Sequence, residues 1–153
     1  MSNYEELLRE IKNSEEKILE VLDGILETID VLNNTEDMNS IKKSLQDIKA
    51  AKIFLLKTSE KSAREKINSP YVLKCTATFK EKLLATVDDV KREILAALET
   101  LKTNPYSSRH LHGNLKGFYR LRFNNKAVIY TVKEGNKTII ALTITTMKHA
   151  LST

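Results

Sequence analysis

The hydrophobic positions in the first fifth of the chain predict one long helix with a continuous apolar stripe. Between Tyr4 and Leu32 apolar residues recur in alternating steps of four and three, and eight of nine positions in the series are apolar. The nine positions are Tyr4, Leu8, Ile11, Glu15, Ile18, Leu22, Ile25, Ile29 and Leu32. This spacing is typical of a coiled-coil seam and differs from the period of two found in strands.

A second apolar run follows a short polar break. Asn33 and Asn34 interrupt the stripe, and Asn tolerates the left-handed backbone conformation that ends a helix. The next apolar positions are Met38, Ile41, Leu45, Ile48 and Leu55, and the pattern then fades through the polar stretch 58–68. We expect two helices of about 30 residues, each roughly 45 Å long, that form an antiparallel hairpin. Ile53 and Phe54 lie off the stripe and need a further partner, either the second half of the chain or a second copy.

Beyond Pro70 the pattern changes to that of a small α+β unit. The residue before a proline avoids the helical region, so Ser69 and Pro70 mark a boundary. The patterns predict a strand at 71–76, a short and a longer helix that end before Pro105, and strands near 116–123, 127–133 and 138–145. The order β-α-α-β-β-β indicates an antiparallel sheet with helices on one face. The predicted fold class is α+β, with a helical hairpin at 1–69 and a second domain at 70–153.

The net charge of +5 conceals an asymmetry between these two parts. Residues 1–70 hold 11 basic and 14 acidic side chains, a net of −3, whereas residues 71–153 hold 14 and 6, a net of +8. A strongly basic unit suits nucleic acid, and the acidic part is a candidate scaffold or intramolecular cover for it. The chain has neither a signal-like N-terminus nor an apolar run long enough for a membrane, and its one cysteine allows no internal disulfide, so we expect a cytoplasmic protein.

The segment 118–123 places basic side chains on one face of a strand. Alternate residues share a face, so Tyr119 and its odd-numbered neighbours point inward, while Phe118, Arg120 and Arg122 point the other way. Two guanidinium groups about 7 Å apart can bind successive phosphates of a nucleic acid, and a neighbouring aromatic ring can stack on a base. The alternative is an ordinary solvated sheet face.

From Asn104 the chain reads NPYSSRHLHGNLKGFYRLRFNNKAVIY, and a last strand reads TIIALTITTMKH. This stretch resembles the RelE/ParE superfamily of toxins from toxin–antitoxin systems. The helix ending L-K-x-N-P, the strand L-x-G-x-L-K-G-x-Y-R-L-R and the strand V-I-Y stand in that family's order. The resemblance covers about residues 71–149, half of the chain, and implies a compact α+β fold of the microbial ribonuclease kind.

In the RelE-like branch, the resemblance implies endonucleolytic cleavage of mRNA on the ribosome, with neither metal nor cofactor. The 2′-hydroxyl attacks its own phosphodiester, which needs a proton acceptor, a proton donor and positive charge around the phosphorane. The implied catalytic residues are Arg120 and Arg122, which hold the phosphate, and His149, whose ordinary pKa of about 6.5 suits acid–base work. The implied RNA-binding residues are Lys116, Phe118, Lys126, Lys148, Arg109 and His110. His110 with His112 alone does not make a zinc site.

Two departures from the family pattern leave alternatives open. Ala127 stands where the family usually has an arginine on the phosphate, and the frequent C-terminal tyrosine is missing. A ParE-like or catalytically inactive homologue would act by binding a protein such as DNA gyrase. The first 70 residues are extra relative to the family, and act either as an antitoxin-like cover over Arg120 and Arg122 or as an oligomerisation module. The expected partners are therefore mRNA with the ribosome, an antitoxin protein or the chain's own hairpin in its place, and a second copy of the chain.

Overall fold

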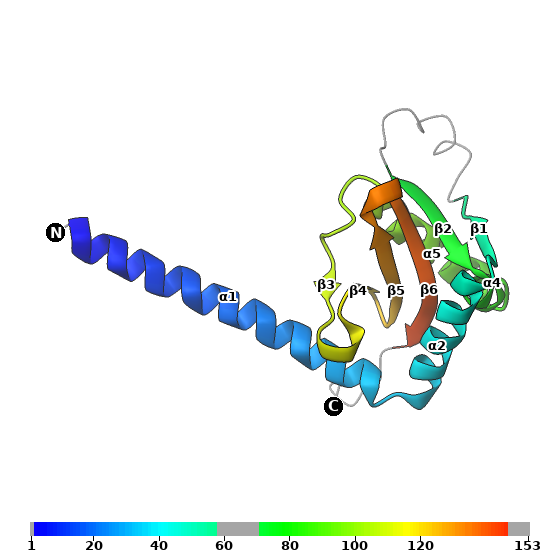
Figure 1. The fold of residues 1–153 in the computed structure, drawn as a ribbon, viewed down its shortest axis with the longest axis horizontal. Helices are drawn as coiled ribbons and strands as arrows, with labels where there is room; N and C mark the ends of the chain where they lie inside the picture. Colours follow the sequence, from blue (N-terminus) through cyan, green and yellow to red (C-terminus); the bar gives the residue numbers. More distant parts are fainter. Residues whose placement is uncertain (1, 58–70, 147–153) are drawn as a thin grey trace.

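The structure is a computed structural model that describes residues 2–57 and 71–146 (Figure 1). The elements in chain order are α1 (Ser2–Leu32), α2 (Thr35–Lys49), β1 (Ile53–Leu55), β2 (Val72–Thr76), α4 (Ala77–Leu84), α5 (Asp88–Leu101), β3 (Arg109–His110), the 3-10 turn η2 (Gly113–Leu115), β4 (Phe118–Phe123), β5 (Lys126–Lys133), the 3-10 turn η3 (Glu134–Asn136) and β6 (Thr138–Thr146). The predicted order β-α-α-β-β-β is present as β2, α4, α5, β4, β5 and β6, which confirms the α+β fold class.

The described strands form one six-stranded sheet in the order β1-β2-β6-β5-β4-β3. The sheet is mixed, which corrects the prediction of a purely antiparallel one, because β2 runs parallel to β6 with Leu73 opposite Ile139. The physical reason is the connection: α4 and α5 carry the chain across one face before β4 begins, so β2 is not joined to its neighbour by a hairpin. The other four pairs, β1–β2, β3–β4, β4–β5 and β5–β6, are antiparallel.

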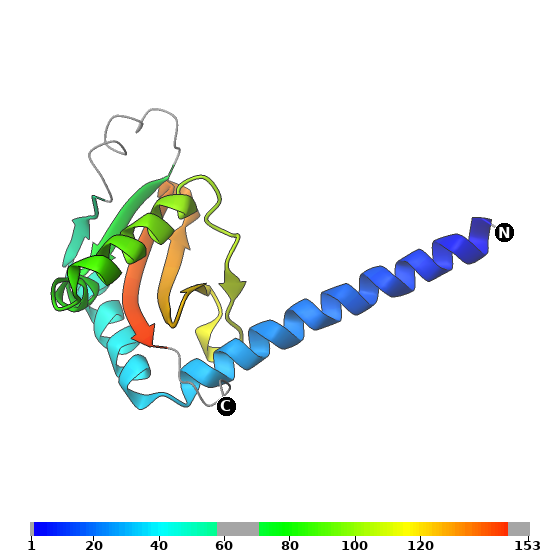
Figure 2. The ribbon, with the colours of Figure 1, turned by 180° about the vertical axis from the view of Figure 1, so that it is seen from behind.

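Each face of the sheet has its own hydrophobic core. On one face α4 and α5 bury residues such as Phe79 and Leu98 against Tyr130, and Figure 2 shows these helices in front of the sheet. On the opposite face α2 and the end of α1 pack Ile41 and Val31 against the sheet in a second cluster. This second face carries the candidate site, because the arginines of β4 point toward it.

The second helix is shorter than predicted. α2 ends at Lys49, and Ile53–Leu55 form the edge strand β1, which pairs antiparallel with β2. Ala51 has a left-handed φ of 58°, which turns the chain out of the helix. The residues that did not fit the apolar stripe, Ile53 and Phe54, therefore pair with the sheet of the second half of the chain.

Polar contacts fix α2 on the sheet. The Ser44 hydroxyl donates to the carbonyl of Leu142 and lies 2.8 Å from the Thr76 hydroxyl. The Asp47 carboxylate accepts from the backbone N–H of Thr78 at 2.9 Å and from its hydroxyl at 2.6 Å. Because these groups are buried, their hydrogen bonds attach α2 firmly to the domain.

α1 and α2 are joined at Asn33 and Asn34, as predicted, and the two helices diverge beyond that turn (Figure 1). Every described side chain from Asn3 to Asp23 is exposed, and only the last third of α1 has buried residues. The first two thirds of α1 therefore project away from the domain.

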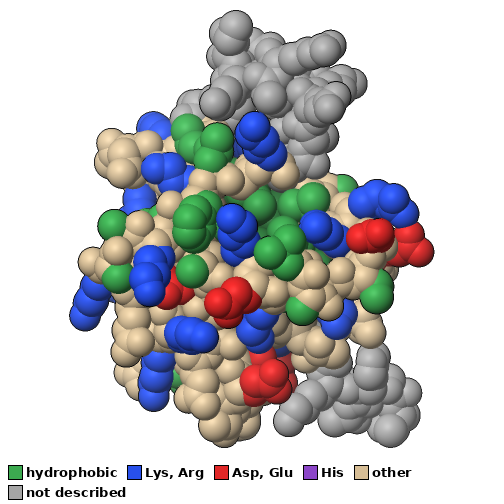
Figure 3. Space-filling view, turned by 90° about the vertical axis from the view of Figure 1, so that its right-hand side faces the viewer, with side chains coloured by type: hydrophobic (Ala, Val, Ile, Leu, Met, Phe, Trp, Pro, Cys, Tyr) green, Lys and Arg blue, Asp and Glu red, His purple; other side chains and the backbone are tan. Residues whose placement is uncertain are grey.

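The edge strand β1 and the helix α4 lie on the right-hand side of Figure 1, which Figure 3 turns toward the viewer. Apolar side chains gather in the middle of this side, with Lys and Arg side chains among them. The Lys80 ammonium lies 4.5 Å from the centre of the Phe54 ring, a cation–π contact at the sheet edge.

None of the helices in the described part of the chain combines the length and the apolar composition that a membrane span requires.

Candidate nucleic-acid interface

Three arginines on two neighbouring strands form the centre of the candidate site. Arg120 on β4 lies directly opposite Arg109 on β3, and Arg122 follows two residues later on the same face of β4. The predicted alternation is confirmed: Tyr119 packs against the core under α4 and α5, while Phe118 packs against the core under α2. Three like charges so close together need counter-charges.

The counter-charges come from α1. Its acidic residues Asp23, Glu27 and Asp30 are spaced by four and three, so they share one helix face. The ion pairs are Arg109 Nη1 to Asp23 Oδ2 at 2.9 Å, Arg120 Nη1 to Glu27 Oε2 and to Asp30 Oδ2 at 2.8 Å each, and Arg122 Nη1 to Glu27 Oε1 at 2.6 Å. We call these three side chains the acidic stripe. The stripe covers the arginines that the sequence singles out.

Burial makes one of these contacts much stronger than an ordinary surface ion pair. The side chain of Arg120 is 1% exposed and that of Glu27 is 7% exposed, whereas Arg122 is 48% exposed. Removing one partner of a buried ion pair leaves an uncompensated charge, which costs several kcal/mol. The Nε of Arg120 has no hydrogen-bond partner among the described residues. Arg120 therefore depends on its contacts with α1.

α1 approaches the loop before β4 so closely that only glycine fits at position 24. A Cβ on Gly24 would lie 2.4 Å from His112 Nε2 and 2.8 Å from the carbonyl oxygen of His110. The Thr28 hydroxyl donates to the Gly24 carbonyl at 2.7 Å and accepts from the backbone N–H of His112 at 2.8 Å. Glycine inside a helix costs about 1 kcal/mol relative to alanine. The close approach explains why this residue type stands there.

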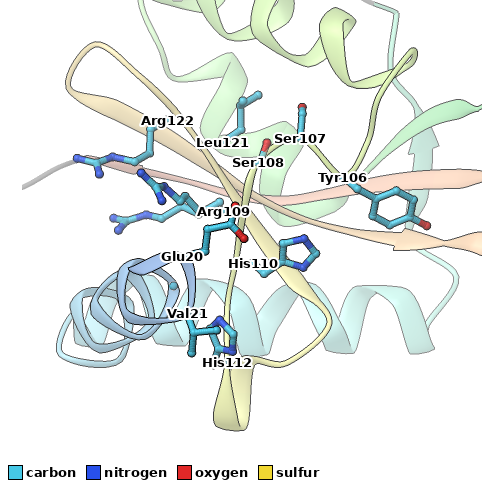
Figure 4. Close-up of a pocket in the computed structure, with 12 residues that line it drawn as sticks. Glu20, Val21, Tyr106, Ser107, Ser108, Arg109, His110, His112, Leu121 and Arg122 are labelled. Carbon is cyan, nitrogen blue, oxygen red and sulfur yellow. The ribbon is translucent and has the colours of Figure 1, made fainter. Parts of the chain in front are cut away.

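A cleft of about 780 Å³ lies between α1, the loop after α5, and β4 (Figure 4). Its lining residues are Glu20, Val21, Gly24, Tyr106, Ser107, Ser108, Arg109, His110, His112, Arg120, Leu121 and Arg122. Figure 4 shows His110 and His112 on the side toward α1, near Glu20 and Val21. The cleft thus combines guanidinium, imidazole and hydroxyl groups, which are the donors that bind phosphate and sugar oxygens.

Tyr106, which lines the cleft, donates a hydrogen bond from its hydroxyl group. The Tyr106 hydroxyl donates to Glu134, which raises the pKa of Tyr106, while Lys137 and then Tyr106 lower the pKa of the Glu134 carboxyl. Burial, followed by the charge of Glu134, also raises the pKa of Tyr119, whose ring lies 4.6 Å from the His110 ring. These phenols are therefore unsuited to the role of general base.

Four of the residues proposed from sequence come together in this cleft: Arg109, His110, Arg120 and Arg122. Phe118 lies on the same face, but it packs into the core under α2 and is not open for stacking on a base.

The other proposed residues lie apart from the cleft or outside the described residues. Lys116 is exposed just after η2. Lys126 begins β5 and donates to the Thr146 hydroxyl at 3.1 Å. Lys148 and His149 lie outside the described residues. Their positions relative to the cleft therefore support an RNA-binding role for the arginines more than for the lysines.

Ala127 is fully buried directly opposite Arg122 in the β4–β5 pair. Its methyl group lies on the arginine face, at the position where the RelE/ParE pattern that the sequence resembles has a further arginine. The ammonium group of the neighbouring residue Lys126 donates to the Thr146 hydroxyl at 3.1 Å.

Sequence reasoning missed the acidic stripe and Gly24. The acids had a readable signal, because Glu20, Asp23, Glu27 and Asp30 recur in steps of three, four and three on the side of α1 away from the apolar stripe. Gly24 had no such signal, since its role depends on a contact with a distant loop. Residues 2–57 and 71–146 contain no group of three or more His, Cys, Asp or Glu residues placed to hold a metal ion.

Comparison with known proteins yielded structural similarities only. No protein-family profile matches the chain, and no similar curated protein was found. One similar structure is the toxin–antitoxin complex RelBE2 of Mycobacterium tuberculosis, at 19% identity and a TM-score of 0.47 over 50% of this chain and 98% of that one. Another is the archaeal RelE–RelB complex of Pyrococcus horikoshii, at 23% identity and a TM-score of 0.45 over 53% and 99% of the two chains.

A third similar structure is a conserved hypothetical protein of Helicobacter pylori, at 17% identity and a TM-score of 0.35, over 48% of this chain and 91% of that one. The first two structures carry the RelE name that the sequence resemblance indicates. Since the TM-scores are all below 0.5, the case for function rests on the side chains of this chain.

Proposed function

We propose that the second half of the chain is a RelE-like toxin of a toxin–antitoxin system, an endonuclease for mRNA on the ribosome. The observation that carries the proposal is the convergence of Arg109, Arg120 and Arg122 from adjacent strands on one cleft. Guanidinium groups bind phosphate oxygens in a bidentate manner and stay protonated at all relevant pH values. The cluster is therefore suited to hold successive phosphates and the charge that develops on the scissile one.

The proposed role of each arginine follows from the solvent exposure of its side chain. Arg109 and Arg122 are about half exposed, so they make the first contacts with the RNA backbone. Arg120 lies deepest and binds the scissile phosphate once its carboxylate partners move away. His149, which the family resemblance implicates, exchanges protons with the 2′-hydroxyl or with the leaving 5′-oxygen. Each proton taken from the 2′-hydroxyl is matched by one given to the leaving oxygen.

We further propose that residues 1–69 act as a built-in cover and that residues 70–153 are the toxin unit. The carboxylates of Glu27 and Asp30 occupy the positions that phosphate oxygens need, since both are anionic oxygen acceptors for the same guanidinium groups. The edge strand β1 and the packing of α2 hold the cover in place. The chain then carries in its own N-terminal part what a separate antitoxin would supply.

A comparison of matched variants tests both proposals. Ribosome-bound mRNA is incubated with the native chain, with Glu27→Gln/Asp30→Asn, and with Glu6→Gln/Glu10→Gln. The last variant removes the same charge from the exposed part of α1. We expect faster cleavage only from the first double variant, and its loss when Arg122→Ala is added. Circular dichroism verifies that all variants are folded.

The outcomes separate the two proposals. Absence of cleavage by every variant would contradict the nuclease. Equal cleavage by the native chain and Glu27→Gln/Asp30→Asn would contradict the cover and leave the nuclease standing.

A second candidate is a homologue without catalysis that acts by binding a protein, as in the ParE-like branch. The observation that favours it is buried Ala127 opposite Arg122, which leaves the strand one arginine short of the family pattern. Inhibition of gyrase supercoiling by Glu27→Gln/Asp30→Asn, without RNA cleavage, supports this candidate. Restoration of cleavage by Ala127→Arg in the same background supports the nuclease ancestry.

A further inference from the structure

The apolar stripe of α1 faces away from the domain along its whole length. The residues of α1 that are buried against the domain are Gly24, Glu27, Thr28 and Val31. With 3.6 residues per turn, the line through Ile18, Ile25 and Ile29 lies roughly 130° around the helix from that contact. One face of α1 therefore holds the arginines while the opposite face remains open.

The open face is larger than a monomeric protein ordinarily leaves uncovered. Twelve large apolar side chains of α1 are between 39% and 65% exposed. They are Tyr4, Leu7, Leu8, Ile11, Ile18, Leu19, Val21, Leu22, Ile25, Leu26, Ile29 and Leu32. A stripe about 42 Å long and roughly 10 Å wide covers about 400 Å², and apolar patches of this size mark interaction sites.

The projecting part of α1 also needs a partner for its own stability. The side chains from Asn3 to Asp23 are all exposed, so packing against the domain does not hold this segment in helical form. Most helical stability in proteins comes from burial of an apolar face and not from helix propensity, and this segment buries no such face against the domain. A partner that covers the stripe supplies that burial.

The spacing of the stripe favours another helix of the same kind as its partner. The stripe follows a heptad pattern over four repeats. Ile18 and Ile25 occupy one of the two seam positions of the heptad, and Leu8, Leu22 and Ile29 occupy the other. Such a seam is self-complementary, because side chains of one helix fill the holes between those of the other. An anionic membrane is disfavoured, since α1 has nine acidic and three basic side chains, the reverse of a membrane-surface helix.

The charges along α1 favour an antiparallel arrangement. All its basic residues, Arg9, Lys12 and Lys17, lie in the first half, and residues 20–32 carry four acidic side chains and no basic one. In an antiparallel pair the three basic side chains of each copy lie beside the segment of the partner that carries four acidic and no basic side chains. A parallel pair would instead align like halves and place Glu15 against Glu15 within the seam.

We propose that this chain associates with a second copy of itself through the apolar stripe of α1, as an antiparallel helix pair. The two domains then lie on the outer sides of the pair, because each acidic stripe faces its own domain. This inference does not depend on the proposed function, since the two faces of α1 are separate.

The mass of the native chain in solution tests the association. Light scattering at tens of micromolar should give twice the monomer mass of 17.4 kDa. Ile18→Glu places a charge in the seam and should weaken association at least tenfold, while Asn13→Glu adds the same charge on the opposite side of the helix and should change nothing. A native monomer, a dimer unaffected by Ile18→Glu, or a monomer that binds anionic lipid vesicles would overturn the proposal.

Disulfide cross-linking tests the orientation without a disruptive charge. Leu8→Cys chains should not cross-link to one another, because the two copies of residue 8 lie at opposite ends of an antiparallel pair. In an antiparallel pair, residue 8 of one copy meets residue 25 or residue 32 of the other, depending on the register. Leu8→Cys chains mixed with Ile25→Cys chains or with Leu32→Cys chains should therefore form disulfide-linked dimers. Buried Cys75 does not interfere. Cross-linking of Leu8→Cys with itself would show a parallel pair and overturn the proposed orientation.

Discussion

The Glu27→Gln variant tests whether the acidic stripe holds α1 on the sheet. Glu27 bonds Arg120 at 2.8 Å and Arg122 at 2.6 Å with its two carboxylate oxygens, and glutamine keeps the size but not the charge. Loss of one partner from a buried ion pair costs roughly 3–5 kcal/mol. Because Asp30 still contacts Arg120 and Arg122 is half exposed, we expect the free energy of unfolding to fall by about 2–3 kcal/mol.

Urea unfolding followed by circular dichroism measures this loss. With a typical slope of about 2 kcal/mol per molar urea, the midpoint should fall by about 1 M. Glu20→Gln is the matched control: Glu20 lies on the same side of α1 and lines the cleft, but makes no ion pair among the described residues. A loss below about 0.5 kcal/mol for Glu27→Gln, or an equal loss for Glu20→Gln, would refute the reasoning. The effect should persist in moderate salt, since buried pairs are screened little.

Three further predictions concern other contacts of the fold. Gly24→Ala should lower the thermal midpoint despite the better helix propensity of alanine, because its Cβ would meet His112 at 2.4 Å; a higher midpoint would contradict the close approach. Asp47→Ala should cost about 1–2 kcal/mol in urea unfolding, since it leaves the buried N–H and hydroxyl of Thr78 without their acceptor, whereas exposed Glu36→Ala should cost far less. Burial raises the pKa of the Cys75 thiol to about 11, so a thiol reagent at pH 8 should modify the folded chain slowly and the unfolded chain rapidly. Equal rates would show that the core under α4 and α5, which contains Cys75, is open to the reagent.

Local sequence patterns predicted which helices and strands form better than they predicted which elements lie next to one another in space. The stripe of α1 and the turn at Asn33 and Asn34 follow from helical periodicity, and the helices α4 and α5 with the three later strands follow from the same rules. The strand β1 did not, because Ile53–Leu55 become extended only by pairing with β2, some 20 residues further along the chain. The parallel β2–β6 contact likewise depends on a crossover that periodicity does not encode.

For the candidate site, strand alternation predicted which face carries Arg120 and Arg122, and the structure confirms it. It could not predict that Arg120 is buried, because the burying group, α1, is about 90 residues away in sequence. The charge asymmetry suggested that the acidic part is either a scaffold or a cover for the basic part. Only the ion pairs in the structure show which face of α1 contacts the sheet. The roles of Lys148 and His149 stay predictions, since both lie outside the described residues.

The turn at Asn33 and Asn34 separates a firmly attached helix from a helix held mainly by its last third. If α1 acts as the proposed cover, it can leave the arginines by a movement at this turn while α2 keeps its buried contacts with the sheet. Because α1 stays tethered at this turn, its effective concentration at the arginines is in the millimolar range, as for other short linkers. A competing RNA or protein at micromolar concentration must bind the arginines about a thousandfold more tightly than α1 does to displace it from half of the molecules. The short turn thus sets a threshold of affinity that any ligand of the cleft must exceed.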